Sequence, residues 1–422
     1  MAWREWLASF LRLPRLDRNM VAVIPIDMIG LLALLLTTRL AAEQLGADDF
    51  GEFQVVRRTS SVVAGLSALG LAVALPRALP TRGPESTVAS LAMGAIITVL
   101  LMSGVATVGL LAIDLGFSPL GLPLPLLIAV ATMGSASALL AAAQGLERGL
   151  LSVRTGNLLA LVPTFVPLVV VLVWARDAAQ LAVTIGLVMA TISAVSLLAR
   201  VRPWPTVAAT LSSMRKLTGI GAPRVIGDVA LFALLAIPAW HLAANGRLAE
   251  AGVITVPMML LQAAASGLSS LGAYLLPHVA RATGHHEFSI VKRTVERSVI
   301  IAVTAATVVM IATFTAFDYI TTILVGDELS VVAGESRWII LAMPGWMMFS
   351  LVRHALEPMS DVPVVTIIVV LGVGAILVSI ATIPATLTAM SIATAAALSG
   401  LGIGSYSAWL VLSQRRITGA GV

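Results

Sequence analysis

The sequence predicts an all-α polytopic membrane protein, with about twelve transmembrane helices of about 20 residues each, arranged as two six-helix repeats. Three observations support this fold class: an excess of apolar residues, apolar stretches of membrane-spanning length, and a repeat between the two halves. Of the 422 residues, 59% are apolar and 11% are charged, whereas a soluble domain has about 45–50% and about 25%. So few polar groups cannot cover a soluble surface, which excludes a soluble enzyme and a disordered chain.

The apolar stretches recur along the whole chain and are long enough to cross a bilayer as helices. The expected spans cover residues 20–41, 54–76, 88–113, 122–144, 156–175, 178–199, 222–243, 251–276, 297–320, 336–356, 362–384 and 388–413. The segment before them, residues 1–19, places tryptophan, leucine and phenylalanine among arginines. This pattern predicts a short amphipathic helix at the membrane interface rather than a cleavable signal peptide.

The distribution of lysine and arginine between the loops predicts the orientation of the chain. With the N-terminus inside, 20 of the 26 basic residues lie on the inner side and only 6 on the outer side. Because cytoplasmic loops carry the excess of lysine and arginine, we expect both termini to be cytoplasmic. The six outer residues are Arg39, Arg57, Arg58, Arg176, Arg247 and Arg337.

The two halves of the chain align with each other. The matched pairs at an offset of 201 residues are Asp27 with Asp228, Gly51 with Gly252 and Pro76 with Pro277. A unit of six helices crosses the membrane an even number of times, so both halves share one orientation. We therefore expect an N-lobe at 20–199, a cytoplasmic linker at 200–221, a C-lobe at 222–413 and a cytoplasmic tail at 414–422.

Ionisable residues within the spans are the candidate coupling groups. Each costs about 2.5–3.5 kcal/mol at a helix centre, so such residues usually face a bundle interior or a watery cavity. Asp27 and Asp228 occupy matching depths in the first and seventh spans, and Arg224 lies four residues before Asp228. Their function would be a proton or cation relay, or the acceptance of hydrogen bonds from a sugar or an amine. The structural alternatives are an Arg224–Asp228 ion pair within one helix and a hydrogen-bonded Asp27.

A polar stripe follows one face of the second span. Gln54, Arg58, Ser61 and Gly65 are spaced by 4, 3 and 4 residues, as one face of a helix requires. The equivalent positions of the eighth span are Thr255, Met259, Gln262 and Ser266. Two polar faces on equivalent helices predict a shared aqueous lining, and hydrogen bonds within each lobe are the alternative.

No motif for enzymatic chemistry accompanies these residues. The chain has no GxxxxGK[ST] loop, no HExxH and no cysteine, so we expect no enzyme activity, no cofactor and no metal site. Prolines do interrupt the spans, at Pro163, Pro167, Pro238 and Pro344. Each favours a kink. Repeated lobes with bent helices are what alternating access requires.

Four segments carry a resemblance to a known family. They are LGADDFGEFQ (45–54) and GLSALGLAVALPRA (65–78), repeated in the second half as RLAEAGVITV (247–256) and GLSSLGAYLLPHVA (267–280). This pattern resembles the multidrug/oligosaccharidyl-lipid/polysaccharide exporter superfamily, in its polysaccharide-transporter branch of Wzx-like flippases. The resemblance implies two six-helix lobes around a cavity lined largely by helices 1, 2, 7 and 8. It also implies alternating-access flipping of a lipid-linked oligosaccharide.

Within that resemblance, Arg39, Arg58 and Arg224 are the candidates by position for contact with a diphosphate or an acidic sugar. With the polar positions Gln54, Ser61 and Gln262 they form the expected substrate-binding set. We expect a monomer in the bacterial cytoplasmic membrane. Its expected partners are a polyprenyl-diphosphate saccharide, the bilayer and polysaccharide-synthesis enzymes, with no nucleic acid.

A proton- or cation-coupled multidrug antiporter of the same superfamily is the alternative function. Its drug-extruding members often depend on a membrane carboxylate in the first or seventh helix, and Asp27 and Asp228 match those places. Charges within the membrane argue against a non-transporting scaffold. The loop PRALPTRGPEST after the second span lacks the signature of the major-facilitator transporters.

Overall fold

The computed structural model describes residues 18–79, 87–117, 123–150, 153–174, 177–265, 285–356, 359 and 363–418. Throughout these ranges the chain is helical apart from short turns. The expected amphipathic segment 1–19 lies almost wholly outside them, as do the ends of the eighth span and of the tail. Asp27 lies in a described helix, but its side chain is outside the described set.

The first helix, α2, runs from Arg18–Ala68 and consists of two helices that meet at Gly46, which has φ 76°. Only glycine adopts such a left-handed conformation without steric cost. A second left-handed glycine, Gly70, caps the short helix α3 at Leu71–Ala78. The first two expected spans therefore lie in α2 and α3, with the turn between them at Gly46.

The remaining helices follow the expected spans in order along the chain, except that residues 321–333, expected to lie between the ninth and tenth spans, are helical as well. They are α4 (Val88–Phe117), α5 (Leu124–Gly149), α6 (Val153–Trp174), α7 (Ala178–Leu198), α8 (Val207–Ala244), α9 (Leu248–Val253), α11 (His285–Thr315), α12 (Phe317–Ala333), the 3₁₀ helix η1 (Gly334–Ala342), α13 (Met343–Leu356), α14 (Val364–Thr382) and α15 (Leu387–Thr418). Within the described residues, ten helices are long and apolar enough to cross a membrane, and Leu161–Val173 is a shorter apolar helix.

Helix α8 joins the expected linker to the expected seventh span. Residues 207–216, which lie within the expected linker, form its first part without a break. Two glycine or serine contacts hold this part against α4: Ser213 donates a hydrogen bond to Ser90 (2.9 Å), and Gly94 packs on Met214. The later part of α8 packs against α14.

The helices differ in how far they are covered by the rest of the protein. In α5, 67% of the most apolar window is buried, but in α11 and α14 only 17% is. Leucine, isoleucine and valine side chains lie on the faces that no other helix covers, for example Leu100, Ile300 and Leu371. An exposed apolar surface of this extent is suited to lipid rather than water.

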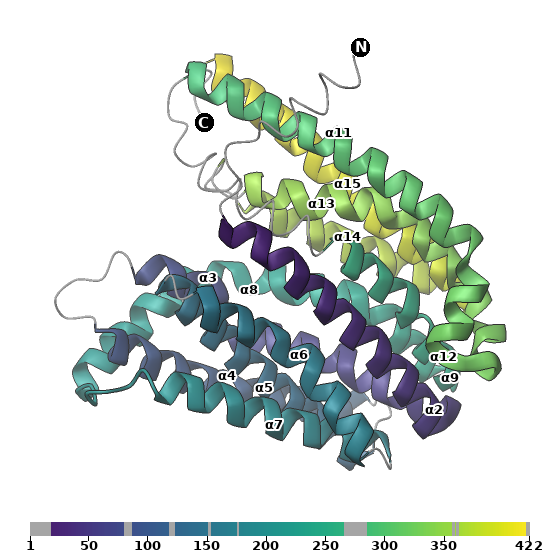
Figure 1. Ribbon diagram of the computed structural model, residues 1–422, viewed down its shortest axis with the longest axis horizontal. Coiled ribbons are helices and arrows are strands. Elements are labelled where there is room, and N and C mark those ends of the chain that lie inside the picture. The colour runs from purple at the N-terminus through teal and green to yellow at the C-terminus, as the bar shows by residue number, and fades with distance from the viewer. Residues whose placement is uncertain are drawn as a thin grey trace.

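Figure 1 shows how the helices are grouped. Helices α4 to α7 lie together, α11, α13, α14 and α15 lie together elsewhere, and α2 passes between these groups. Helix α2 packs against α5 and α6 on one side and against α8 and α9 on another. The dark purple first part of α2 is the part that passes between the groups, and the polar stripe expected on the second span lies on its second part, after Gly46.

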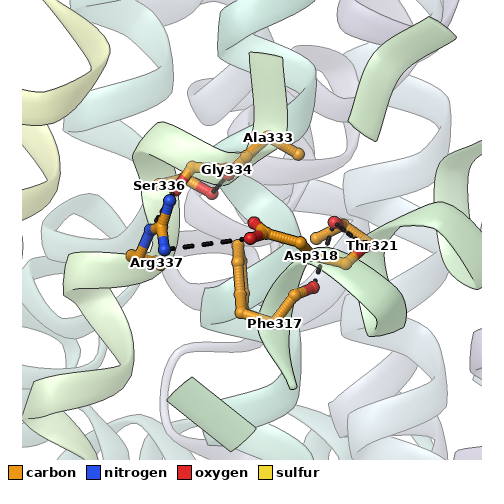
Figure 2. Close-up of polar contacts among 7 residues, drawn as sticks. All are labelled: Phe317, Asp318, Thr321, Ala333, Gly334, Ser336 and Arg337. Atoms are coloured by element: carbon orange, nitrogen blue, oxygen red, sulfur yellow. Dashed lines mark hydrogen bonds and ion pairs between the residues drawn. The ribbon is translucent and has the colours of Figure 1, made fainter. Parts of the chain in front are cut away.

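The tenth expected span changes helix type within its length. Residues Gly334–Ala342 form nine residues of 3₁₀ helix, followed by α13, and such long 3₁₀ runs are uncommon. Figure 2 shows the contacts at its start: Arg337 donates to the carbonyl oxygen of Gly334 (2.9 Å) and pairs with Asp318 (3.8 Å). The irregular segment lies directly before Pro344, where the sequence predicted a kink.

Candidate functional site

The second half of α2 extends between two contact regions. Gly51 lies near its start and Gly70 just beyond its end, about 28 Å apart at 1.5 Å per residue. We call the first region the glycine-turn end, because the left-handed glycines Gly46 and Gly246 lie beside it. We call the second region the arginine end, after the cavity described below.

At the glycine-turn end the two halves meet through backbone. A Cβ atom on Gly51 would overlap the carbonyl oxygen of Leu248, and one on Gly252 would lie 2.9 Å from Cα of Gly51. These two glycines are the pair that the 201-residue repeat matches. The repeat therefore brings equivalent positions of the two halves into direct contact.

The polar stripe faces the second half of the chain. Arg58 donates to the side-chain oxygen of Gln262 and to the carbonyl oxygen of Thr255, both at 3.4 Å. Thr38 donates to the sulfur of Met259 (3.3 Å), and Trp240 donates to Thr59 (2.8 Å). The structure thus brings Arg58 and Gln262 together, two residues that the sequence predicted from separate helices.

The other predicted polar residues on α2 occupy different surroundings. Arg39 donates to the carbonyl oxygen of Thr322 in α12 (2.9 Å) and pairs with Glu43 on its own helix. Gln54 is buried, and the hydroxyl of Ser61 donates to the carbonyl oxygen of Arg57 (3.0 Å). Arg39 therefore connects α2 to α12 and takes no part in the Arg58–Gln262 contact.

At the arginine end, α3 and α8 also touch through glycine. A Cβ atom on Gly70 would lie 2.8 Å from the carbonyl oxygen of Gly221. Further along α8, a Cβ on Gly227 would lie 2.6 Å from Oγ1 of Thr366, the third residue of α14. These close approaches set α3, α8 and the start of α14 around one space.

That space is a cavity of about 410 Å³ lined by α3, α8, α13 and α14. Arg224 and Asp228, both predicted from the sequence, line it from α8. Three further basic residues line it that the sequence did not single out for binding: Arg77, Arg353 and His354. Arg353 also lies over the ring of Phe349, 5.7 Å from its centroid.

The sequence does carry a signal at Arg77 and Arg353, their positive charge, but that signal indicates the orientation of the chain and not a binding site. Both count among the inner basic residues, and each stands at the end of a span. Their meeting point depends on the packing of helices from different halves, which a hydropathy pattern does not specify. In the described residues, the cavity therefore holds arginines from three helices, and only Arg224 was a predicted ligand.

Comparison with known proteins identifies the fold. No protein-family model and no curated protein matches the sequence. An inward-facing multidrug resistance MATE transporter of the MOP superfamily matches with a TM-score of 0.67 and 13% identity, covering 95% of this chain and 98% of that one. The chain has the MATE fold.

Two further structures with the MATE fold match over nearly the same length. An outward-facing MATE transporter of the MOP superfamily gives a TM-score of 0.60 at 13% identity, covering 95% of this chain and 96% of that one. A Vibrio cholerae MATE transporter with an aspartate-to-asparagine substitution gives 0.58 at 16%, covering 96% and 97%. All three are transporters. The likeness confirms the fold class expected from the sequence at the level of an all-helical, multi-pass membrane protein.

Proposed function

We propose that this protein is an alternating-access transporter that flips a lipid-linked oligosaccharide across the bacterial cytoplasmic membrane. In this proposal twelve spans form two six-helix lobes, with both termini cytoplasmic. One observation carries it: the halves are joined by polar and backbone contacts at the glycine-turn end, and a charged cavity lies between helices of both halves at the arginine end. Such asymmetry is what one state of a rocking transporter presents.

The direction of the asymmetry agrees with the expected orientation. Arg224 and Arg353 belong to the inner side by the charge rule, and Arg39 and Arg58 to the outer side. The arginine end would then face the cytoplasm, and the closed glycine-turn end would face outward. The TM-score is also higher against the inward-facing MATE structure, 0.67, than against the outward-facing one, 0.60.

The charge of the cavity supports an anionic substrate. Among the residues that the structure describes, its lining includes three arginines and one carboxylate, Asp228. Arginine binds phosphate oxygens through paired hydrogen bonds, so a diphosphate-linked saccharide fits this lining better than a lipophilic cation does. Arg58, Gln262, Gln54 and Ser61 would contact the head group as the halves rock, with Arg39 at the outer exit.

Reconstitution tests the proposal. Purified protein would be placed in liposomes with a fluorescent polyprenyl-diphosphate oligosaccharide, and an impermeant quencher would report which leaflet holds the lipid. We expect protein-dependent flipping, and we expect Arg39→Ala/Arg58→Ala to abolish it while the protein stays folded by thermal unfolding. Full flipping by this double variant would reject the assigned roles. A pH gradient imposed on the same vesicles tests Asp27 and Asp228 as coupling groups.

A second candidate function is a proton- or cation-coupled multidrug antiporter. The observation that favours it is the fold, since the matching inward-facing structure is of a multidrug resistance transporter. It also uses Asp228, whose carboxylate lines the cavity. This candidate predicts proton exchange for a lipophilic cation in the same vesicles, lost in Asp27→Asn and Asp228→Asn. Exchange without any flipping of the saccharide lipid would make it the leading function.

A further inference from the structure

We propose that an uncovered face of α11 binds an anionic phospholipid of the surrounding membrane, with Arg293 and Arg297 holding the lipid phosphate. The inference does not rest on the proposed function, because none of the residues involved lines the cavity at the arginine end. It rests on three features of α11: the residues on this face, the depth of the two arginines in the membrane, and the contacts on the other side of the helix.

The first feature is a continuous exposed stripe along α11. Only 17% of the most apolar window of this helix is buried. The stripe has spacings of 4, 3, 4, 4 and 3 residues, as one face of a helix requires. Its members are all exposed: Arg293, Arg297, Ile300, Thr304, Val308 and Ile311. All of them except Ile311 line one hollow against the helix. We call this stripe the α11 face.

The second feature is the depth of the two arginines. Residues 298–315 carry no charge. The helix from Arg297 to Thr315 is about 27 Å long at 1.5 Å per residue, close to the hydrocarbon thickness of about 30 Å. Arg297 therefore lies at one edge of the hydrocarbon. Arg293 lies about 6 Å beyond it, within a head-group layer of about 5–8 Å, where the lipid phosphates are.

Below the arginines the α11 face is apolar for the depth of one leaflet. Ile300, Val308 and Ile311 are 63%, 64% and 56% exposed. Thr304 does not interrupt this surface, because its hydroxyl donates to the carbonyl oxygen of Ile300 (2.8 Å). The distance from Ile300 to Ile311 is about 16 Å, about half of the hydrocarbon thickness. Charge at head-group level above one leaflet of apolar surface matches a single phospholipid molecule.

The third feature is the use of the neighbouring charges by the protein itself. Helices α11 and α15 run side by side (Figure 1), and Lys292 donates to the side-chain oxygen of Gln414 in α15 (3.2 Å). Lys292 also pairs with Glu296 (3.8 Å), the carboxylate nearest the α11 face. Within the described part of the chain, Arg293 and Arg297 form no hydrogen bond or ion pair. The lysine is thus used for packing, whereas the two arginines are directed to the membrane.

Helix α14 shows why the arginines should select one class of lipid. It is as uncovered as α11, at 17%, but Val364–Thr382 carries no charged residue. Such a surface contacts any lipid. Arginine pairs with phosphate, and a zwitterionic lipid offsets its phosphate with its own cation. Each basic residue near the surface should therefore enrich anionic lipid by about fivefold, at α11 and not at α14.

The test measures the lipid composition beside each helix by fluorescence quenching. The chain has no cysteine, so Thr304→Cys carries a fluorophore on the α11 face, and Leu371→Cys carries it on exposed α14 as the control. Leu371 lies seven residues after the start of α14, as Thr304 lies seven residues after Arg297. The full-length protein is reconstituted in phosphatidylcholine liposomes that contain brominated phosphatidylglycerol or brominated phosphatidylcholine.

We expect brominated phosphatidylglycerol to quench the fluorophore at position 304 at a lipid fraction about tenfold lower than brominated phosphatidylcholine. At position 371 the two lipids should quench equally. Arg293→Gln/Arg297→Gln should remove the difference at position 304. Arg148→Gln is the matched control and should keep it, because Arg148 is exposed near the end of α5, away from the α11 face.

Three results would overturn the site. The first is equal quenching by the two lipids at position 304. The second is an unchanged preference in Arg293→Gln/Arg297→Gln, with folding verified by thermal unfolding. The third is the same preference at position 371, which would indicate a general attraction of anionic lipid to a basic protein.

A second copy of the chain is the other occupant that could cover this face. Oxidation of unlabelled Thr304→Cys in dilute proteoliposomes tests for it. Disulfide-linked dimers in high yield would assign the α11 face to an interface between copies and would overturn the lipid site. Monomers that keep the preference for phosphatidylglycerol would support it.

Discussion

The glycine-turn end and the arginine end are built from similar parts but differ in what their charged residues contact. Both have helices from opposite halves in contact at glycine, at Gly51 with Gly252 and at Gly70 with Gly221. At the first end Arg58 is bonded to protein groups across the contact. At the second end the arginines surround a cavity. The difference separates a polar contact that joins the halves from a cavity that lies between them.

The absence of cysteine makes this comparison measurable, because engineered pairs meet no background thiols. Thr38 and Met259 are in contact across the halves at the glycine-turn end. The variant Thr38→Cys/Met259→Cys would report closure of that end through its cross-linking yield. We use this reporter for the predictions below, which run from the largest expected effect to the smallest.

The largest effect is expected from Gly51→Val. Any side chain at this position would overlap the backbone of Leu248, which cannot rotate away as a flexible side chain could. Overpacking typically costs about 1–3 kcal/mol and occasionally more, and we expect the upper part of that range here. We expect the reporter cross-link to fall by about tenfold or more. Gly104→Val is the control, because nothing lies within 4 Å of a Cβ there. Equal cross-linking yields in both variants would show that the glycine at position 51 is not needed for contact between the two halves.

The second prediction is a loss of thermal stability without a change in the contact between the two halves. Glu147 is buried, at 1% side-chain exposure, and forms two hydrogen bonds with Arg200 at 2.9 and 3.0 Å. Arg200→Ala leaves this carboxylate buried without its partner, which should cost about 3 kcal/mol. Glu147 belongs to the first half and Arg200 follows directly after that half, at the start of the expected linker, so we expect a lower thermal unfolding midpoint and an unchanged cross-link. A changed cross-linking yield would mean that this ion pair also affects the contact between the two halves.

A smaller effect is expected at the polar contact between the halves. Arg58→Ala removes two hydrogen bonds, but both are long, at 3.4 Å, so we assign them about 1 kcal/mol together. The reporter cross-link should then fall by about fivefold. Ser61→Ala is the matched control, because that hydroxyl bonds within its own helix. A drop in the control of the same size would place the effect in α2 itself rather than in the contact.

The smallest effect is expected from Asp318→Asn. Its partner Arg337 is 3.8 Å away, and the carboxyl side chain is 70% exposed. Exposed ion pairs contribute at most about 1 kcal/mol. We expect no change in the cross-link and a shift in unfolding free energy below about 0.5 kcal/mol. A large destabilisation would show that the start of the 3₁₀ segment depends on this pair.

The sequence indicated the residues at the contact between the halves better than those of the cavity, although it predicted an aqueous lining there and not hydrogen bonds between the halves. The stripe on the second span and its counterpart on the eighth were readable from helical spacing, and the repeat matched Gly51 with Gly252. A repeat relates equivalent positions, so it can indicate a contact that lies on the axis between them. Arg58 and Gln262 also meet, although they are not equivalent in the repeat: each lies on one of the two matched helix faces.

The residues that line the cavity are not related by the repeat, so the repeat could not indicate the cavity. Arg77, Arg224 and Arg353 occupy three unrelated positions in three helices, and their convergence depends on how α3 and α13 pack around α8. Hydropathy likewise placed the spans but not the 3₁₀ run at Gly334–Ala342. There the local hydrogen-bond pattern changes while the apolar composition continues.

The unbroken course of α8 constrains the spacing of the chain. Its first part is fixed to α4 through Ser213, and eleven residues later Arg224 enters the cavity lining. Each residue added to a helix turns everything beyond it by about 100°. One inserted residue between Ser213 and Arg224 would therefore rotate Arg224 and Asp228 away from the cavity together. The length of this segment should consequently vary only in steps that preserve helical phase, whatever its individual residues become.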